Sequence, residues 1–444
     1  MKKIIYTISV LIVLGLVAFG IWHFFINNKT TIPVEENTNT SNTGFKPINR
    51  NTIPVENRIA TTSVNTSTST QKVNQNFQNN NNIVSKLPTL RRLSDTPVGG
   101  ATVETISTTT FVRWIDRGRG NIYEASNINS NITILSNTIL PKVYESIWNK
   151  NMNTFVALSL SESTNRVTTL YSTLQPRFAS TVQKKNTNST STIQNAPDTT
   201  VTPYELKGTK LPDNVISVSE SPKKDKAIIV IKEGKNGVGY IATFDGKKMT
   251  KLFSTPLTEI SVEWPEENTI AIHTSAGSNI GGFLYFINAK TGFMRKILGP
   301  LPGLSTKVSH DAKNVIVSVT GDEKNLRSAI YNVTTGKTVD ILVNTLAEKC
   351  VWSRAFVEDA YCSVPSQIDQ GSYPDDWYKG NVRFSDKIWQ INSKTGTINM
   401  ISNLLNQADR IIDGINLKLD DKDKYLIFMN KNDLTLWSLE LASK

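Results

Sequence analysis

The residues best suited to chemistry lie in one acidic and aromatic segment, Gln367 to Phe384 (QIDQGSYPDDWYKGNVRF). Carboxylates beside aromatic rings can bind a carbohydrate, a cation or a peptide. The alternative is structural, with Pro374 and Trp377 packing the segment onto the domain while the acids face water. Because loops on a rigid scaffold commonly carry recognition, we expect a ligand or partner surface made of Asp369, Tyr373, Asp375, Asp376, Trp377 and Tyr378.

Catalysis, metal binding and cofactor binding have little support in this sequence. The region after residue 86 contains two histidines, His273 and His310, and neither has the spacing of a metal ligand. The G-x-S-x-G, P-loop and dinucleotide-binding motifs are missing. We therefore expect no catalytic residue, metal or cofactor, although a carboxylate pair for glycoside cleavage can come together through folding alone.

The two cysteines, Cys350 and Cys362, flank a predicted hairpin with the strands KCVW and YCSV. Facing positions on antiparallel strands have Cβ atoms about 4.5–5.5 Å apart, which is close enough for a disulfide after a small adjustment. Outside the cytoplasm such a pair tends to oxidise. A disulfide is therefore predicted, and two buried free thiols are the alternative.

The beginning of the chain has the pattern of a membrane anchor. Residues 1–3 are a positively charged tip, and residues 4–26 are almost continuously apolar. As a helix the apolar segment would be about 35 Å long, enough to cross a hydrocarbon core of about 30 Å. A cleaved signal peptide is the alternative, but its apolar stretch is usually shorter. Lys2 and Lys3 favour a cytoplasmic amino end, so the rest of the chain is expected outside the cytoplasmic membrane.

Two stretches have the composition of disordered chain. Residues 27–86 are rich in Ser, Thr and Asn and cannot bury enough apolar surface to order themselves. Residues 178–200 are similar and are expected to form a flexible insertion. The net charge of +11 comes from scattered basic residues. This pattern is typical of a solvated surface, so no nucleic-acid partner is expected.

The region 87–444 repeats a strand–turn–strand unit about every 40 residues. The closing stretch from Tyr425 to Leu441 (YLIFMNKNDLTLWSLEL) shows the unit clearly. A second recurring element occurs in FINAKTGFMRKI, IYNVTTGKTVDI and QINSKTGTINMI. Its glycines are expected to supply the positive φ that a hairpin turn needs, namely Gly292, Gly336 and Gly396. A helical connection is expected within residues 401–412.

About seven such units, each with four short strands, resemble a β-propeller, an all-β fold. Six blades would follow if the first two units merge. The closing unit shows three clear strands, so a strand from Ala101 to Ile106 is expected to complete it. The third unit is expected to cover residues 201–257.

The starts of the second strands resemble those of TolB-like and WD40-like (PD40-type) repeats, at Ser221-Pro222, His310-Asp311 and Asp420-Asp421. The Trp-Asp dipeptide of WD40 repeats is missing. Anchor, linker and propeller together resemble membrane-anchored proteins of small-genome bacteria, and this resemblance implies an architecture without a particular chemistry.

These observations predict a membrane-tethered, extracytoplasmic propeller that is a scaffold for a protein or glycan of the cell envelope. The alternative is a propeller-type hydrolase or lyase that acts on carbohydrate or peptide through the acids of residues 367–384. The two hypotheses differ in whether the mouth of the central channel carries convergent acids or only packed apolar and amide side chains.

Overall fold

A computed structural model of the chain describes residues 89–161, 166–177, 202–321 and 325–441. All of them belong to one compact unit, Asn82–Lys444. The predicted anchor (4–26), linker (27–86) and insertion (178–200) lie outside the described residues. Within the described residues, no helix has the length and apolar character needed to cross a membrane.

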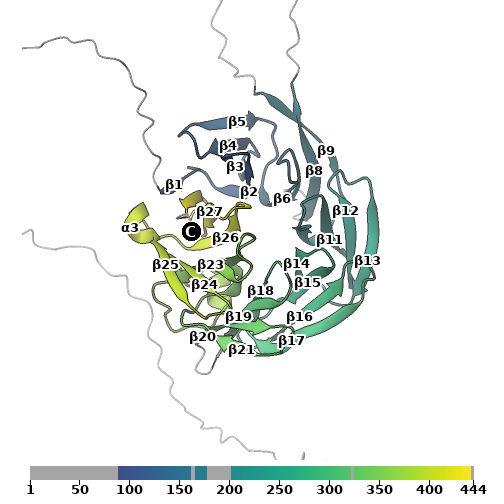
Figure 1. The fold of residues 1–444 in the computed structure, drawn as a ribbon. Helices are drawn as coiled ribbons and strands as arrows, with labels where there is room; N and C mark the ends of the chain where they lie inside the picture. The colour runs from purple at the N-terminus through teal and green to yellow at the C-terminus, as the bar shows by residue number, and fades with distance from the viewer. Residues whose placement is uncertain (1–88, 162–165, 178–201, 322–324, 442–444) are drawn as a thin grey trace, which may run out of the picture. The chain divides into compact units, whose positions relative to one another are not determined.

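The described residues form seven antiparallel sheets of four strands each, arranged as the blades of a ring (Figure 1). In blades 1 to 6, four consecutive strands run from the centre outward. The predicted all-β propeller with seven blades is therefore confirmed, and the alternative with six blades is wrong.

The strands of the first three blades follow the chain in order. Blade 1 contains β2 (Val98–Ile106), β3 (Thr109–Asp116), β4 (Ile122–Ser126) and β5 (Ile132–Ser136). Blade 2 contains β6 (Val143–Trp148), β7 (Thr154–Leu160), β8 (Val167–Pro176) and β9 (Tyr204–Lys210). Blade 3 contains β10 (Val215–Glu220), β11 (Lys226–Glu233), β12 (Asn236–Thr243) and β13 (Met249–Thr255).

The remaining blades include three short helices. Blade 4 contains β14 (Ile260–Glu266), β15 (Thr269–Thr274), β16 (Gly281–Asn288) and β17 (Met294–Pro302). Blade 5 contains β18 (Ser305–Val308), β19 (Asn314–Thr320), β20 (Leu326–Asn332) and β21 (Thr338–Asp340). Blade 6 follows the 3-10 helix η2 (Ala347–Lys349) and contains β22 (Cys350–Trp352), β23 (Asp359–Pro365), α2 (Asp375–Tyr378), β24 (Asp386–Asn392) and β25 (Ile398–Asn403). After α3 (Leu404–Ala408), blade 7 contains β26 (Gly414–Leu419), β27 (Tyr425–Asn430), β28 (Leu436–Glu440) and β1 (Leu90–Arg92).

The core lies between neighbouring blades, and the second strand of a blade is buried on both faces. On β11, Ile229 packs with Leu158 of blade 2, whereas Ile228 packs with Ile272 of blade 4. Two-sided burial explains why the second strands are continuous apolar runs instead of alternating sequences.

The turn between the first and second strands explains the repeat motif. In four blades a polar side chain at the end of the first strand accepts a hydrogen bond from the backbone N–H five residues later. The residue three positions after each of these has a positive φ. The capping residues are Asn149, Ser221, Ser309 and Asp420. Because the motif satisfies the hydrogen bonding of backbone N–H groups in the turn, it specifies the turn and is not evidence of a ligand site.

The turn between the third and fourth strands matches its prediction. Gly292, Gly336 and Gly396 have φ values of 72°, 69° and 71°. The side chain of Asn288 accepts hydrogen bonds from the backbone N–H groups of Lys290 and Thr291, which closes the first of these turns. The helix α3 lies within the segment 401–412, as expected.

Two expected strand assignments are wrong. Ala101 to Ile106 belongs to β2, the innermost strand of blade 1, and the strand that completes blade 7 is β1, with Leu90 opposite Leu439. The stretch Tyr204–Lys210 pairs with β8 as the fourth strand of blade 2, so blade 3 begins at Val215 and not at residue 201. Residues 178–200 separate the paired strands in the sequence, which explains the misplaced boundary.

Candidate binding site in the central channel

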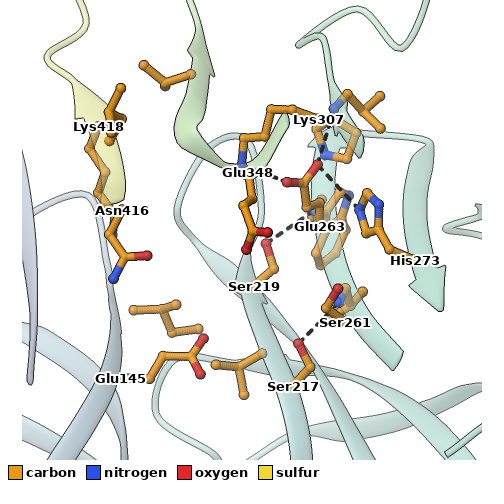
Figure 2. Close-up of a pocket in the computed structure, with 18 of the residues that line it drawn as sticks. Glu145, Ser217, Ser219, Ser261, Glu263, His273, Lys307, Glu348, Asn416 and Lys418 are labelled. Atoms are coloured by element: carbon orange, nitrogen blue, oxygen red, sulfur yellow. Dashed lines mark hydrogen bonds and ion pairs between the residues drawn. The ribbon is translucent and has the colours of Figure 1, made fainter. Parts of the chain in front are cut away.

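The innermost strands of all seven blades line a central cavity of about 850 Å³. Because side chains alternate along a strand, Ile260 and Val262 of β14 are buried in the core between blades, whereas Ser261 and Glu263 are accessible at the cavity wall. Charged groups reach the cavity from several blades, and Figure 2 shows Asn416 and Lys418 on one wall with Glu263 and His273 on another.

The best-defined charge cluster joins blades 4 and 5. Lys307 Nζ lies 2.6 Å from Glu263 Oε1, and His273 Nε2 lies 3.6 Å from Glu263 Oε2. His273 Nδ1 is also hydrogen bonded to the hydroxyl of Thr306. Burial alone would raise the pKa of Glu263, but Lys307 and His273 hold that pKa well below its usual range. Glu263 is therefore a carboxylate at neutral pH.

A second cluster joins blades 1, 2, 3 and 7. Lys418 Nζ donates a hydrogen bond of 2.9 Å to the carbonyl oxygen of Ala101 and lies 4.0 Å from Glu220 Oε1. Burial lowers the pKa of Lys418, and the charge of Glu220 opposes that shift. Burial also raises the pKa of Glu145 to about 7; Lys418 opposes this shift and Glu220 adds to it. The charge of this cluster therefore changes near neutral pH.

A histidine and an arginine complete this lining. His310 Nε2 lies 3.0 Å from the carbonyl oxygen of Trp352. Its pKa is lowered to about 4, mainly by burial and further by Arg354, so that the ring is neutral at physiological pH. Within the described residues, Arg354 forms no hydrogen bond or ion pair, and its side chain is an exposed cation at the cavity wall.

Ion pairs link four blades where the turns between the first and second strands lie. Glu104 of blade 1 is almost completely buried and pairs with both Lys150 and Lys224. Lys150 also pairs with Asp421 of blade 7. These pairs satisfy each other and hold the turns of blades 1, 2, 3 and 7 together.

The acidic and aromatic segment 367–384 connects β23 to β24 and reaches across blade 5 to blade 4. Asp375 Oδ2 accepts a hydrogen bond of 2.6 Å from the backbone N–H of Ser278 in blade 4. The carbonyl oxygen of Tyr373 accepts a hydrogen bond from Thr320 of blade 5. Tyr378 is half exposed and donates a hydrogen bond to Glu348 at the cavity wall. Among the six predicted site residues, Tyr378 is the one that lines the cavity.

The other predicted site residues shape the segment itself. The rings of Tyr373 and Trp377 are buried and pack beside Phe384. Asp376 Oδ2 accepts a hydrogen bond from the backbone N–H of Ser372. Asp369 accepts one at 2.7 Å from the side chain of Gln367, so these groups are engaged in local structure.

Cys350 and Cys362 face each other on β22 and β23 and are joined in a disulfide with an S–S distance of 2.09 Å. Both lie in the apolar cluster between blades 5 and 6, next to Trp352 and Ile316. The disulfide therefore fastens the innermost strand of blade 6 to its neighbour.

The charged residues of the channel were not singled out by sequence reasoning. Their common signal is a charged residue inside a short first strand that is otherwise apolar or small, as in VYESIW, ISVEWPE and GINLKL. These residues are Glu145, Glu220, Glu263, Lys307 and Lys418.

The walls of the channel thus carry convergent acids from several blades, and Glu220, Glu263 and Glu348 each lie close to a basic or hydroxyl group. No group of three or more His, Cys, Asp or Glu side chains within the described residues is placed to hold a metal. The arrangement can bind a polar ligand that presents both charges, and its carboxyl with a pKa near 7 can exchange a proton.

No protein-family model matches the sequence, and no curated protein resembles it closely enough to count as a relative. Similar solved structures include TolB from Acinetobacter baumannii, which is 11% identical with a TM-score of 0.40 over 65% of this chain and 63% of that chain. They also include the β-propeller domain of the Trilobed protease from Pyrococcus furiosus, at 10% identity and a TM-score of 0.45 over 77% and 94%. A putative TolB from Agrobacterium tumefaciens is 12% identical, with a TM-score of 0.36 over 52% and 74%. The likeness concerns the propeller fold alone, and the seven blades are assigned from the sheets themselves.

Proposed function

We propose that the protein is a binding scaffold of the cell envelope that holds a charged segment of a partner protein in the channel of its propeller. The observation that supports this function best is the channel whose walls carry charged groups of both signs from several blades (Figure 2). Electrostatic complementarity of this kind gives specificity and orientation to a bound chain.

A protein partner fits the channel better than a neutral glycan. Lys418 is partly stripped of water by burial, and Glu145 is a carboxyl whose charge burial disfavours. Charged side chains or a chain terminus of a peptide would compensate such groups, whereas neutral sugars offer hydroxyls alone.

The location follows from the sequence pattern and belongs to the proposal. Residues 4–26 would anchor the chain in the cytoplasmic membrane, and residues 27–86 would tether the propeller outside it. Such a tether raises the effective concentration of the propeller near other envelope proteins.

A hydrolase or lyase is the second candidate, and two observations favour it: acids from several blades converge on the channel, and burial raises the pKa of Glu145 to about 7, as a general acid or base requires. In this alternative the acid lies in the channel and not in the segment 367–384, where Asp375 and Asp376 are bound to backbone N–H groups. Loss of peptide or glycan cleavage in Glu145→Gln, with partner capture unchanged, would favour the enzyme over the scaffold.

The scaffold is tested by placing a photo-activated cross-linker at two positions of the full chain in intact envelopes. Ser261 is exposed inside the channel, and Lys296 is exposed on the outermost strand of blade 4. We expect a discrete protein cross-link from position 261 and none of the same mass from position 296. Equal products from both positions, or none from position 261, would contradict binding in the channel.

A charge variant refines this experiment. Lys418→Gln should weaken the cross-link from position 261 several-fold, because the variant removes a cation from the cavity wall. Lys251→Gln, which removes an exposed cation of β13 outside the cavity, should leave the yield of this cross-link unchanged. Equal effects of the two variants would indicate a general charge effect on the surface.

A further inference from the structure

Three ionisable side chains meet in a completely buried cluster between blades 6 and 7. Lys349 ends η2, Asp386 begins β24, and Asp413 immediately precedes β26. The three side chains have no solvent exposure. The cluster is separate from the central cavity, which these residues do not line.

Lys349 contacts both carboxylates. Its Nζ lies 2.8 Å from Asp386 Oδ2 and is hydrogen bonded to Asp413 Oδ1. The other oxygen of Asp413, Oδ2, accepts hydrogen bonds from Trp377 Nε1 at 2.8 Å and from the backbone N–H of Phe384 at 3.2 Å. The two oxygens of Asp413 therefore differ, since one faces an amine and the other faces two fixed N–H donors.

Asp386 is held differently. Its Oδ2 accepts hydrogen bonds of 2.7 Å from Ser363 Oγ and from the backbone N–H of Gly414. Its Oδ1 is buried and has no hydrogen-bond partner within the described residues. Burial raises the pKa of Asp386, and Lys349 opposes that shift. An oxygen without a donor suits a carboxyl group that takes up a proton.

Aromatic rings exclude water from the amine. Lys349 Nζ lies 5.3 Å from the ring centroid of Trp377 and 5.0 Å from that of Phe384. Each charge held in such surroundings is costly to bury. An amide between the amine and one carboxyl would remove one charge of each sign.

We propose that Lys349 and Asp413 react with each other to form an intramolecular amide bond, and that Asp386 transfers the protons. Asp386 relays a proton from the Lys349 ammonium to Oδ1 of Asp413, and the neutral Nζ attacks Cγ of the resulting carboxylic acid. The C–N bond forms and the C–Oδ1 bond breaks. Asp386 passes a second proton from Nζ to the leaving Oδ1, which departs as water. An ammonium and a carboxylate thus become an amide and one water molecule, with no redox change.

The remaining oxygen is already placed for this reaction. As Cγ becomes tetrahedral, negative charge develops on Oδ2, which Trp377 Nε1 and the Phe384 N–H stabilise as fixed donors. The fold holds nucleophile and electrophile in contact, which replaces a bimolecular encounter with an intramolecular step. The bond would fasten blade 6 to blade 7, which is the blade that β1 completes.

The test is the intact mass of the full chain, purified in detergent under reducing conditions. We expect the wild-type mass to be lower by one water molecule than the mass of the sequence, and the Lys349→Met variant to have its full mass. Trypsin should not cleave after Lys349, and fragmentation should show a branched peptide that joins residues 349 and 413. A wild-type chain of full mass, cleaved after Lys349, would overturn the proposal without recourse to any variant.

Two further variants identify the roles. Asp413→Asn should give the same branched product, because its amide loses ammonia where the carboxyl loses water. Asp386→Asn should keep the full mass or lose water slowly, because it cannot relay protons. A branched product at residue 386, or unchanged reaction in Asp386→Asn, would refute the assignment.

Discussion

Lys307 Nζ lies 2.6 Å from Glu263 Oε1, so a single ion pair joins the innermost strands of two neighbouring blades at the wall of the channel. The side chains are 31% and 22% exposed, respectively. A pair in this position can stabilise the ring and also present charge to a ligand.

The first prediction concerns the stability that this pair supplies. Lys307→Gln should lower the free energy of unfolding by roughly 1–3 kcal/mol at pH 7, a value between those of exposed and buried pairs. Because the folded-state pKa of Glu263 is depressed below 4.5, its contribution is present above pH 4.5 and is lost as the pH falls below that value. The difference between wild type and variant, measured by urea unfolding, should therefore shrink below pH 4.5.

Lys296→Gln is the control, because Lys296 is exposed on β17 outside the cavity. It should change the free energy of unfolding by about 0.5 kcal/mol or less. A Lys307→Gln effect that stays the same at pH 7 and at about pH 2, well below the unfolded-state pKa of Glu263, would show that the ion pair is not its source.

The second prediction concerns Glu145, whose pKa burial raises from 4.5 to about 7. A carboxyl with a raised folded-state pKa stabilises the fold below its unfolded value, and this contribution is lost as the pH rises to about 7. Glu145→Gln cannot ionise, so it should gain roughly 1–3 kcal/mol relative to wild type between pH 5 and pH 8. Urea unfolding at these two pH values measures the gain. Glu259→Gln, at an exposed carboxyl, should show no such gain.

The sequence predicted the blades well where local chemistry determines them. Ile228 and Ile229 belong to an apolar run that predicts a strand, and Asn288 and Gly292 are a turn signal within five residues. These features need no knowledge of distant contacts. The three-residue strand β1 has no such local signal, because its pairing partner Leu439 lies at the other end of the chain.

The candidate site could not be predicted for a related reason. Glu145 and Lys418 lie far apart in the sequence and interact only because the ring brings blades 2 and 7 to a common channel. Trp377, by contrast, stands out in the sequence as an aromatic residue beside acids, but its burial depends on tertiary packing. Residue type showed that the segment 367–384 was unusual, but not which of its side chains would be accessible.

The third prediction separates these structural roles from recognition. Trp377→Ala should lower the free energy of unfolding by about 3–5 kcal/mol, the usual loss for a buried aromatic ring. The variant also removes a hydrogen-bond donor to Asp413. Tyr378→Phe should have little effect on stability, since the ring is half exposed, and should alter binding in the channel. Thermal unfolding and the cross-link from position 261 measure the two effects. Equal destabilisation by both variants would contradict this division.

The fourth prediction concerns closure of the ring. Leu90 on β1 is buried opposite Leu439 on β28. Leu90→Asp should therefore cost about 2–4 kcal/mol and should speed amide hydrogen exchange in β28 first. The matched control is Ile106→Asp, the same kind of change at a side chain that is 54% exposed. Exchange that rises equally in β28 for both variants would argue against closure by β1.

The fifth prediction concerns the disulfide between Cys350 and Cys362, which are separated by 12 positions. Reduction should lower the free energy of unfolding by roughly 2–3 kcal/mol, because a closed loop of this size restricts the unfolded chain. Urea unfolding with and without a strong reductant measures the loss, and the Cys350→Ala/Cys362→Ala double variant should not respond to the reductant. If both thiols of the unreduced, denatured protein can be alkylated, the bridge is absent and blade 6 is held by packing alone.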